Sequence, residues 1–448
     1  MVDCPLFVSL EFGAFVKPLS EITSLQDLLQ AFPAMSPAEF SRYLARFESE
    51  GFRAREEARL FCRVWGEYCR ALREGGGEIS FLHPLVSVFQ FPAVEEIREQ
   101  LIQSAIPDLR ELFRVGIHER YPEFADDWLF PLKILAALTS PRDSGEVVSQ
   151  VIRSGFGGES FVWGVIFDQV GDDPDWCRFL WNSCSEDPPD LFCGICFLDL
   201  ANQLSNEVTG GSEFGIHPFR GAKGVALLEE WLESDDPGDE SYAMSAAEAL
   251  TFLSEGDRRH LLGIAREHDS EEVRLRAASC LLKEDESGGI ELLRELCLNP
   301  ATTGRATEML ERLGKFKEIP VEVSVPEFRA LAEFCDWLRN PENFGEIADE
   351  IDCIGRERLY WPPAGAEREL YLFRYVYHSE CHEGSAPDEV GVGVVGSRTV
   401  SLVGQTSATM SFREILALHC CWELQQNGDP SAPALLSIEE GLKLLDRT

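Results

Sequence analysis

The chain has 448 residues, of which 44% are apolar and 26% are charged, and its net charge is −38 with a sequence pI near 4.5. This composition excludes a disordered, collagen-like or fibrous chain, and the length predicts roughly two to four domains. A surface this negative repels phosphate backbones and anionic lipid headgroups, which argues against nucleic-acid binding and against docking on a membrane surface.

Targeting signals are not evident in the sequence. The first basic residue is Lys17, so the start lacks the basic stretch of a secretory signal, and no apolar run approaches the ~18 residues of a membrane span. The 14 cysteines are too sparse for a disulfide scaffold, and many stand in apolar helical runs. We therefore expect a cytoplasmic protein with reduced thiols.

Residues 1–142 are predicted to form a helical N-terminal region. The run Ser36–Glu39 is a capping box with Pro in the first turn of the helix that follows. A second helix is predicted from Arg53 to Arg73, where three glycines end it. Further helices are predicted at 94–103, 107–119 and 126–138.

Residues 143–317 repeat with a period of about 30 residues. The blocks Ala246–Leu250, Ala277–Leu281 and Ala306–Leu310 start 31 and 29 residues apart, and each follows an apolar helical run. Each repeat is therefore a helix, a short turn and a second helix, and such pairs must stack to bury their apolar faces. With weaker matches upstream, the pattern predicts an α-solenoid of about five helix pairs. The side chains expected to be buried are Ala247, Leu250, Ala278, Leu281 and Leu310.

One of these repeats resembles a known family. The run Asp269–Arg274, followed by Ala277, Ala278 and Leu281, resembles the signature of bacterial HEAT repeats, with Asp in the turn and Val-Arg at the start of the second helix. The resemblance implies that Asp269 and Arg274 are structural and bridge adjacent repeats. Because the other repeats lack this pair, a ladder of such bridges is not expected.

Residues 318–448 are predicted to form a small α+β domain, so the fold class is mostly α. Side chains that alternate with period two indicate strands. The predicted helices are Pro326–Arg339, Pro341–Asp352, Ser411–Gln426 and a short terminal helix, and the predicted strands are Arg358–Trp361, Glu369–His378, Val390–Val395 and Thr399–Val403. The block from Tyr371 through Gly391–Ser397 to Leu418–Leu424 is similar to C-terminal modules attached to HEAT repeats in large bacterial proteins, a resemblance that implies no chemistry.

Two short motifs match cofactor or redox patterns, but we expect both to be structural. The glycines at 391, 393 and 396 match the dinucleotide fingerprint, yet Val390–Val403 continues into a strand and not into the helix that would meet a pyrophosphate. Cys193 and Cys196 form a CxxC inside an apolar helical run, which indicates a buried pair. No cofactor is expected.

A metal site is chemically possible in the C-terminal domain. His378, Cys381, His382 and His419 are residue types that bind zinc. Their spacing matches no known signature, so we expect no bound metal. If a metal is bound, these four residues are the candidate ligands.

The charge of the repeats suggests a function. Residues 143–317 hold 34 acidic and 15 basic residues, a net charge of −19, and stacked repeats align their acidic turns along one edge. This pattern predicts a scaffold that binds a basic protein partner and has no catalysis of its own. The candidate partner-binding residues are Asp235, Asp236, Asp239, Glu240, Asp269, Glu271 and Glu272.

Other functions stay open at this point. The charge could serve solubility alone. The chain could instead be an enzyme or an enzyme accessory, with a site in the C-terminal α+β domain or in its cleft with the repeats. Some HEAT-like repeat proteins attach bilin pigments to phycobilisome proteins, so the resemblance also leaves a lyase open.

Overall fold

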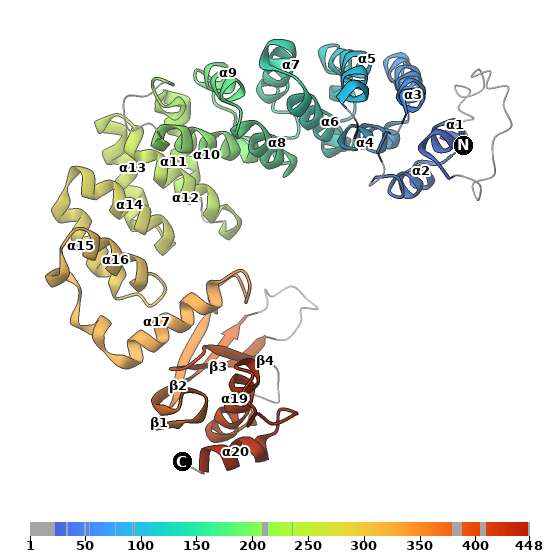
Figure 1. The fold of residues 1–448 in the computed structure, drawn as a ribbon. Coiled ribbons are helices and arrows are strands. Elements are labelled where there is room, and N and C mark those ends of the chain that lie inside the picture. The colour runs from blue at the N-terminus through green and yellow to red at the C-terminus, as the bar shows by residue number, and fades with distance from the viewer. Residues whose placement is uncertain are drawn as a thin grey trace. The chain divides into compact units, whose positions relative to one another are not determined.

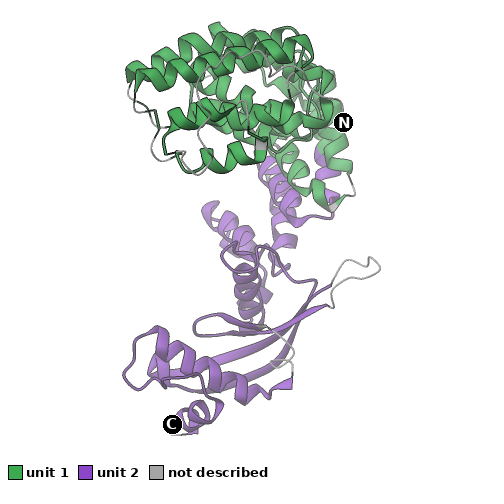
Figure 2. Cartoon of the chain, turned by 90° about the vertical axis from the view of Figure 1, so that its right-hand side faces the viewer, with its two compact units in different colours: residues 1–261 green, residues 262–448 purple. Residues whose placement is uncertain are grey.

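The computed structural model describes residues 23–32, 35–48, 51–52, 54–76, 78–91, 93, 95–207, 214–234, 236–378, 388–403 and 409–446. The described chain is mostly helical, with a small four-stranded antiparallel sheet near its C-terminal end (Figure 1). It divides into two compact units, unit 1 (residues 1–261) and unit 2 (residues 262–448) (Figure 2). The division falls inside the predicted repeat region, within helix α13 (Glu255–Glu267).

Unit 1 consists of consecutive helices joined by turns and short 3-10 segments. They are α1 (Leu25–Ala31), α2 (Pro37–Leu44), α3 (Arg55–Glu74), α4 (Leu82–Ser87), α5 (Glu95–Arg114), α6 (Ala125–Leu138), α7 (Pro141–Arg153), α8 (Val162–Gly171), α9 (Pro174–Cys184), α10 (Leu191–Glu207), α11 (Ala222–Glu233), α12 (Glu240–Ala249) and the first part of α13.

These helices pack in an alternating order. α3, α5, α7 and α9 contact one another in series, and α4, α6, α8, α10 and α12 form a second series of the same kind (Figure 1). Contacts between α6 and α7 and between α8 and α9 join the two series. A helix in one series therefore buries its apolar side against neighbours in both.

Local sequence signals begin the helices as predicted. The Ser36 hydroxyl accepts a hydrogen bond from the Glu39 N–H (3.3 Å) and the Glu39 carboxylate accepts one from the Ser36 N–H (3.1 Å), which confirms the capping box of α2. At the start of α9, Asp173 accepts a hydrogen bond from the Asp175 N–H (2.9 Å). These side chains satisfy amide groups that have no partner within the helix.

The structure corrects the region that contains Pro107. The two helices predicted at 94–103 and 107–119 are one helix, α5, with Pro107 in its interior. A proline removes one helical hydrogen bond and usually bends or ends a helix. Leu101 and Ala105 before the proline, and Leu109 after it, are all buried. Packing on both sides therefore keeps the helix continuous.

The alanine-rich blocks are buried with one exception. Ala247, Leu250, Ala278 and Leu310 are each fully buried, as predicted. Leu281 is only half-buried, so the prediction was wrong for this residue. Successive residues of a helix point about 100° apart, and Cys280 takes the inward direction next to it.

Unit 2 continues with helices and then forms the sheet. Its elements after α13 are α14 (Glu271–Glu284), α15 (Glu286–Cys297), α16 (Thr303–Arg312), α17 (Pro326–Arg339), β1 (Glu350–Trp361), β2 (Ala366–Tyr377), β3 (Glu389–Val395), β4 (Val400–Val403), α19 (Phe412–Gln426) and α20 (Ile438–Asp446). The helix predicted at Pro341–Asp352 is wrong: residues 341–346 form turns and bends, and β1 has begun by Glu350. Pairing with β2 makes Glu350–Asp352, the end of the predicted helix, part of β1.

The sheet separates two apolar cores. Its strands lie in the order β1-β2-β3-β4. Phe373 and Tyr375 of β2 face α17 and pack with Phe334, whereas Leu372 packs with Ile415 of α19 in the other core. This alternation confirms the period-two pattern of the second predicted strand.

Candidate functional site

The acidic turn of unit 1 precedes α12. Asp236 accepts a hydrogen bond from the backbone N–H two residues later (2.9 Å), and Asp239 accepts one from the Ser234 hydroxyl (2.7 Å). Asp236 and Glu240 are exposed. Asp235 lies outside the described residues. The described acids therefore shape their own turn and also present negative charge to solvent.

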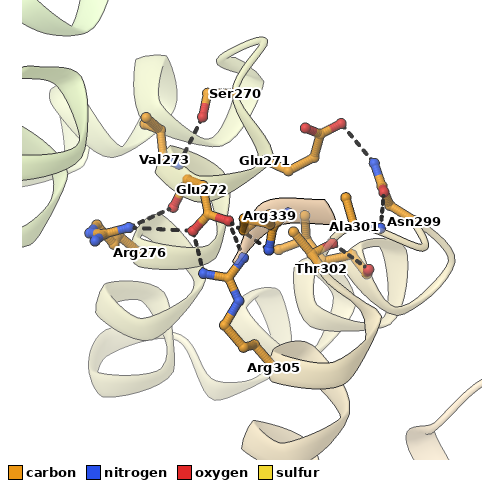
Figure 3. A network of polar contacts seen from close by, with 11 residues as sticks. Ser270, Glu271, Glu272, Val273, Arg276, Asn299, Ala301, Thr302, Arg305 and Arg339 are labelled. Atoms are coloured by element: carbon orange, nitrogen blue, oxygen red, sulfur yellow. Dashed lines mark hydrogen bonds and ion pairs between the residues drawn. The ribbon is translucent and has the colours of Figure 1, made fainter. Parts of the chain in front are cut away.

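The acidic turn of unit 2 precedes α14. Asp269 is exposed, and Ser270 caps the helix by accepting a hydrogen bond from the Val273 N–H (3.5 Å). Glu271 accepts a hydrogen bond from the Asn299 side chain (2.7 Å), which lies in the turn between α15 and α16 (Figure 3). Glu271 therefore ties the start of α14 to the following helix pair.

Glu272 is the centre of a charged network (Figure 3). Arg305 of α16 donates to both of its carboxylate oxygens, Arg339 of α17 lies 3.4 Å from it, and Arg276 of α14 lies 3.7 Å from it. Only 17% of the Glu272 side chain is exposed. Burial alone would raise its pKa, but the hydrogen bonds and charge of Arg305, followed by the other two arginines, lower the pKa overall. This acid joins three helices of its own chain.

Arg274, for which the resemblance implies a bridging role, lies on the same helix. Its guanidinium donates to the Arg266 carbonyl (3.2 Å) and forms an ion pair with Glu295 of α15. It therefore connects the end of α13, the start of α14 and the next helix. The bridging role implied for Asp269 stays a prediction.

A second acidic surface lies on helices and not on turns. α8, α10 and α12 contact one another in series, and we call these three helices the acidic row. Their sequences include Asp168, Asp199 and Glu248, which are all exposed, but no Lys, Arg or His. Only the packing reveals the row, because these helices are separated by others along the chain.

The acidic row contains an open pocket between α10 and α12, with a volume of about 460 Å³. Its lining residues are Asp199, Asn202, Gln203, Asn206 and Glu248. The four residues from α10 stand at positions i, i+3, i+4 and i+7, which places them on one face of the helix. Sequence reasoning missed this polar stripe, although its helical spacing is visible in the sequence.

Two residues of the C-terminal domain with side chains that can transfer protons, His419 and Glu423, lie in its core. Glu423 accepts hydrogen bonds from the Trp361 indole (2.7 Å) and the Ser397 hydroxyl (2.8 Å). His419 stacks between Trp361 and Trp422, with ring centroids 5.2 and 5.8 Å away. His419 is 1% exposed and Glu423 is 5% exposed. This cluster therefore supports the packing of α19 against the sheet.

The residues named as possible metal ligands are not gathered by the described structure. His378 is exposed at the end of β2, where Asp388 (3.3 Å) and then Glu350 (3.4 Å) raise its pKa, whereas His419 is in the core. Cys381 and His382 lie outside the described residues. Among the residues that are described, no group of three or more His, Cys, Asp and Glu side chains could hold a metal ion.

The two short motifs have the structural character predicted for them. Cys193 and Cys196 are buried within α10, and burial raises the pKa of Cys196 to about 12, which keeps its thiol protonated and unreactive. The glycines at 391 and 393 belong to β3, and β3 and β4 pair antiparallel. Gly396 lies in the connection between these strands, so no helix follows the motif.

Acid is expected to weaken the C-terminal domain through His419. Burial lowers its pKa from 6.5 to about 4, even with the Glu423 carboxylate 3.6 Å away. The unfolded chain therefore binds a proton that the folded chain does not bind, and stability falls as pH drops from 6.5 towards 4, by about 3 kcal/mol. Hydrogen exchange of α19, corrected for the intrinsic rate at each pH, measures this loss.

The matched variant for this experiment is His419→Phe, which keeps the stacked ring and removes the titratable group. We expect α19 to lose less protection in this variant than in the original chain over the same pH range. His378→Gln serves as a control, because the raised pKa of His378 acts with the opposite sign. An identical pH response of the original chain and His419→Phe would contradict the prediction.

Comparison of the chain with known proteins found no match: no protein-family model, no curated protein and no solved structure matches it. Across the described ranges, no helix combines the length and the apolarity that crossing a membrane requires. The HEAT-repeat resemblance therefore stays a prediction based on the run Asp269–Arg274 and on Ala277, Ala278 and Leu281.

Proposed function

We propose that this protein is a scaffold that binds a basic protein partner on an acidic surface of a HEAT-like α-solenoid and has no catalytic activity of its own. The observation that carries the proposal is the acidic row, in which three helices in contact contain acids and no basic residue. Complementary charge of this kind raises the association rate and selects against acidic partners.

Two further observations support a scaffold over the enzyme alternative. The helices of unit 1 contact their second neighbours along the chain, as stacked helix pairs do. In the C-terminal domain, His419 and Glu423 are buried and serve its packing.

The cysteines in the described part of the chain are free thiols, and this supports the proposal of a cytoplasmic protein.

The test measures association with a basic protein captured by the full chain at low salt. Association should slow as NaCl rises above about 50 mM, because salt screens the attraction. A variant with Asp168→Lys, Asp199→Lys and Glu248→Lys should lower the association rate roughly tenfold. Its matched control is Glu229→Lys, Glu230→Lys and Glu233→Lys on α11, which makes the same change in net charge outside the acidic row.

A separate variant tests the acidic turns. Asp236→Lys and Glu240→Lys change the turn of unit 1, and Asp269→Lys changes that of unit 2. Glu272 must be left unchanged, because its carboxylate is held by three arginines. Binding that is insensitive to salt and to both variants would contradict the scaffold proposal, as would tight binding of the original chain to duplex DNA.

A further inference from the structure

The hydrogen-bonding groups of the pocket between α10 and α12 are mostly acceptors. Asn202 donates its side-chain N–H to the Ser245 carbonyl (3.0 Å). A carbonyl can only accept, so this contact fixes the orientation of the amide. One N–H of this amide and its side-chain oxygen, which is an acceptor, then remain.

That oxygen is the most informative atom of the pocket. Asn202 is 2% exposed, and its Oδ1 has no hydrogen-bond partner among the described residues. Buried polar groups in folded proteins nearly always have a partner. The atom belongs to a residue that lines the pocket, and any ligand group that pairs with it must be a donor.

The rest of the lining has the same preference for donors. Asn206 donates one side-chain N–H to Glu248 (3.0 Å), which leaves its Oδ1 as an acceptor and its second N–H as a donor. The carboxylates of Asp199 and Glu248 can only accept and bring two negative charges. Gln203 is the remaining lining residue, and its amide can serve as either donor or acceptor.

We infer that this pocket recognises a guanidinium group, namely an arginine side chain supplied by the partner protein. A guanidinium carries a positive charge, has five N–H donors in one plane and has no acceptor, so it matches a lining rich in acceptors on two helices. An ammonium group has the charge but concentrates its three donors at one point. The inference rests on the proposed function and makes its partner more specific.

The experiment compares three fluorescent peptides that differ only in whether they contain arginine, lysine or citrulline. Their binding to the full chain is measured by anisotropy at about 50 mM NaCl, where charge attraction persists. The arginine peptide should bind roughly tenfold tighter than the lysine peptide. The citrulline peptide keeps the shape but loses the charge, and should not bind measurably.

Variants place the binding in the pocket. Asp199→Asn with Glu248→Gln should weaken the arginine peptide roughly tenfold, while Glu230→Gln with Glu233→Gln on α11 should change its affinity less than about twofold. A third variant, Asn202→Leu, removes the buried acceptor without changing net charge, and it should reduce the preference for arginine over lysine. Thermal unfolding of each variant checks that it is folded.

Several results would overturn the inference. Equal affinity for the arginine and lysine peptides, or equal weakening by the pocket and α11 variants, would reduce the binding to general charge attraction. Free L-arginine that binds as tightly as the peptide would make the pocket a small-molecule site and remove the partner from the inference. If the pocket variant leaves binding of the captured protein intact while the lysine variants of the acidic row abolish it, the arginine site fails and the scaffold proposal stands.

Discussion

Gly393→Ala is expected to lower the free energy of unfolding of the C-terminal domain by roughly 3 kcal/mol, the upper part of the range for overpacking a core. A Cβ atom at this position would overlap the ring of Phe334. That ring is fully buried and stacks on Phe373 (centroids 5.6 Å apart) and on Trp337 (6.1 Å), so it has no free space to move into. Urea unfolding, followed by hydrogen exchange of β2 and β3, measures the loss.

The controls separate crowding from a general effect of replacing glycine. Gly263→Ala in α13 meets no atom within 4 Å and should leave stability unchanged or slightly increased. Phe334→Leu in the background of Gly393→Ala should recover part of the loss, because the smaller side chain makes room. If Gly393→Ala is as stable as the original chain, the packing explanation is wrong.

Lack of space for a side chain also explains the glycines at 391 and 396. A Cβ atom on Gly391 would overlap Tyr375, and one on Gly396 would overlap the Glu369 carbonyl. Gly396 also has a backbone φ of +116°, a conformation that side chains disfavour. The three glycines let large rings and a neighbouring strand approach β3 closely, which requires no nucleotide. The hypothesis of a dinucleotide site would be supported if the original chain bound a dinucleotide and stably folded variants at these glycines bound it less tightly.

Glu272→Ala is expected to destabilise unit 2 by about 2 kcal/mol, less than a fully buried ion pair because its arginines are partly exposed. The change would leave Arg276, Arg305 and Arg339 facing one another without the carboxylate that holds them. It would also remove the contact that joins α14 to α16 and α17. Urea unfolding, read through hydrogen exchange of these three helices, measures the effect.

Two further variants serve as comparisons for Glu272→Ala. Glu271→Ala removes an acid held by one hydrogen bond from Asn299 and should cost about 1 kcal/mol or less. Arg305→Ala should cost less than Glu272→Ala, because Glu272 keeps its other two arginines. Equal small effects of Glu272→Ala and Glu271→Ala would show that the network contributes little. Glu272 would then be available to a partner like the other acidic residues.

Short-range patterns in the sequence determined much of the architecture. The capping box at Ser36, the glycine hairpin after β3 and the alternation along β2 are each specified by residues a few positions apart. The helix predicted at Pro326–Arg339 has those bounds in α17. Such features depend on local backbone and packing preferences, so they can be predicted from the sequence without knowing the fold.

Tertiary structure decided the features that depend on residues far apart in the chain. Pro107 lies inside a continuous helix because buried side chains on either side hold it there, and the last three residues of a predicted helix belong to β1 because β2 pairs with them. Glu272 looks like one more acid of an acidic turn until α16 and α17 bring it Arg305 and Arg339. The polar stripe of α10 becomes a pocket only when α12 packs beside it. In each case the stabilising free energy comes from contacts between segments far apart in the chain, and local conformational preferences do not include these contacts.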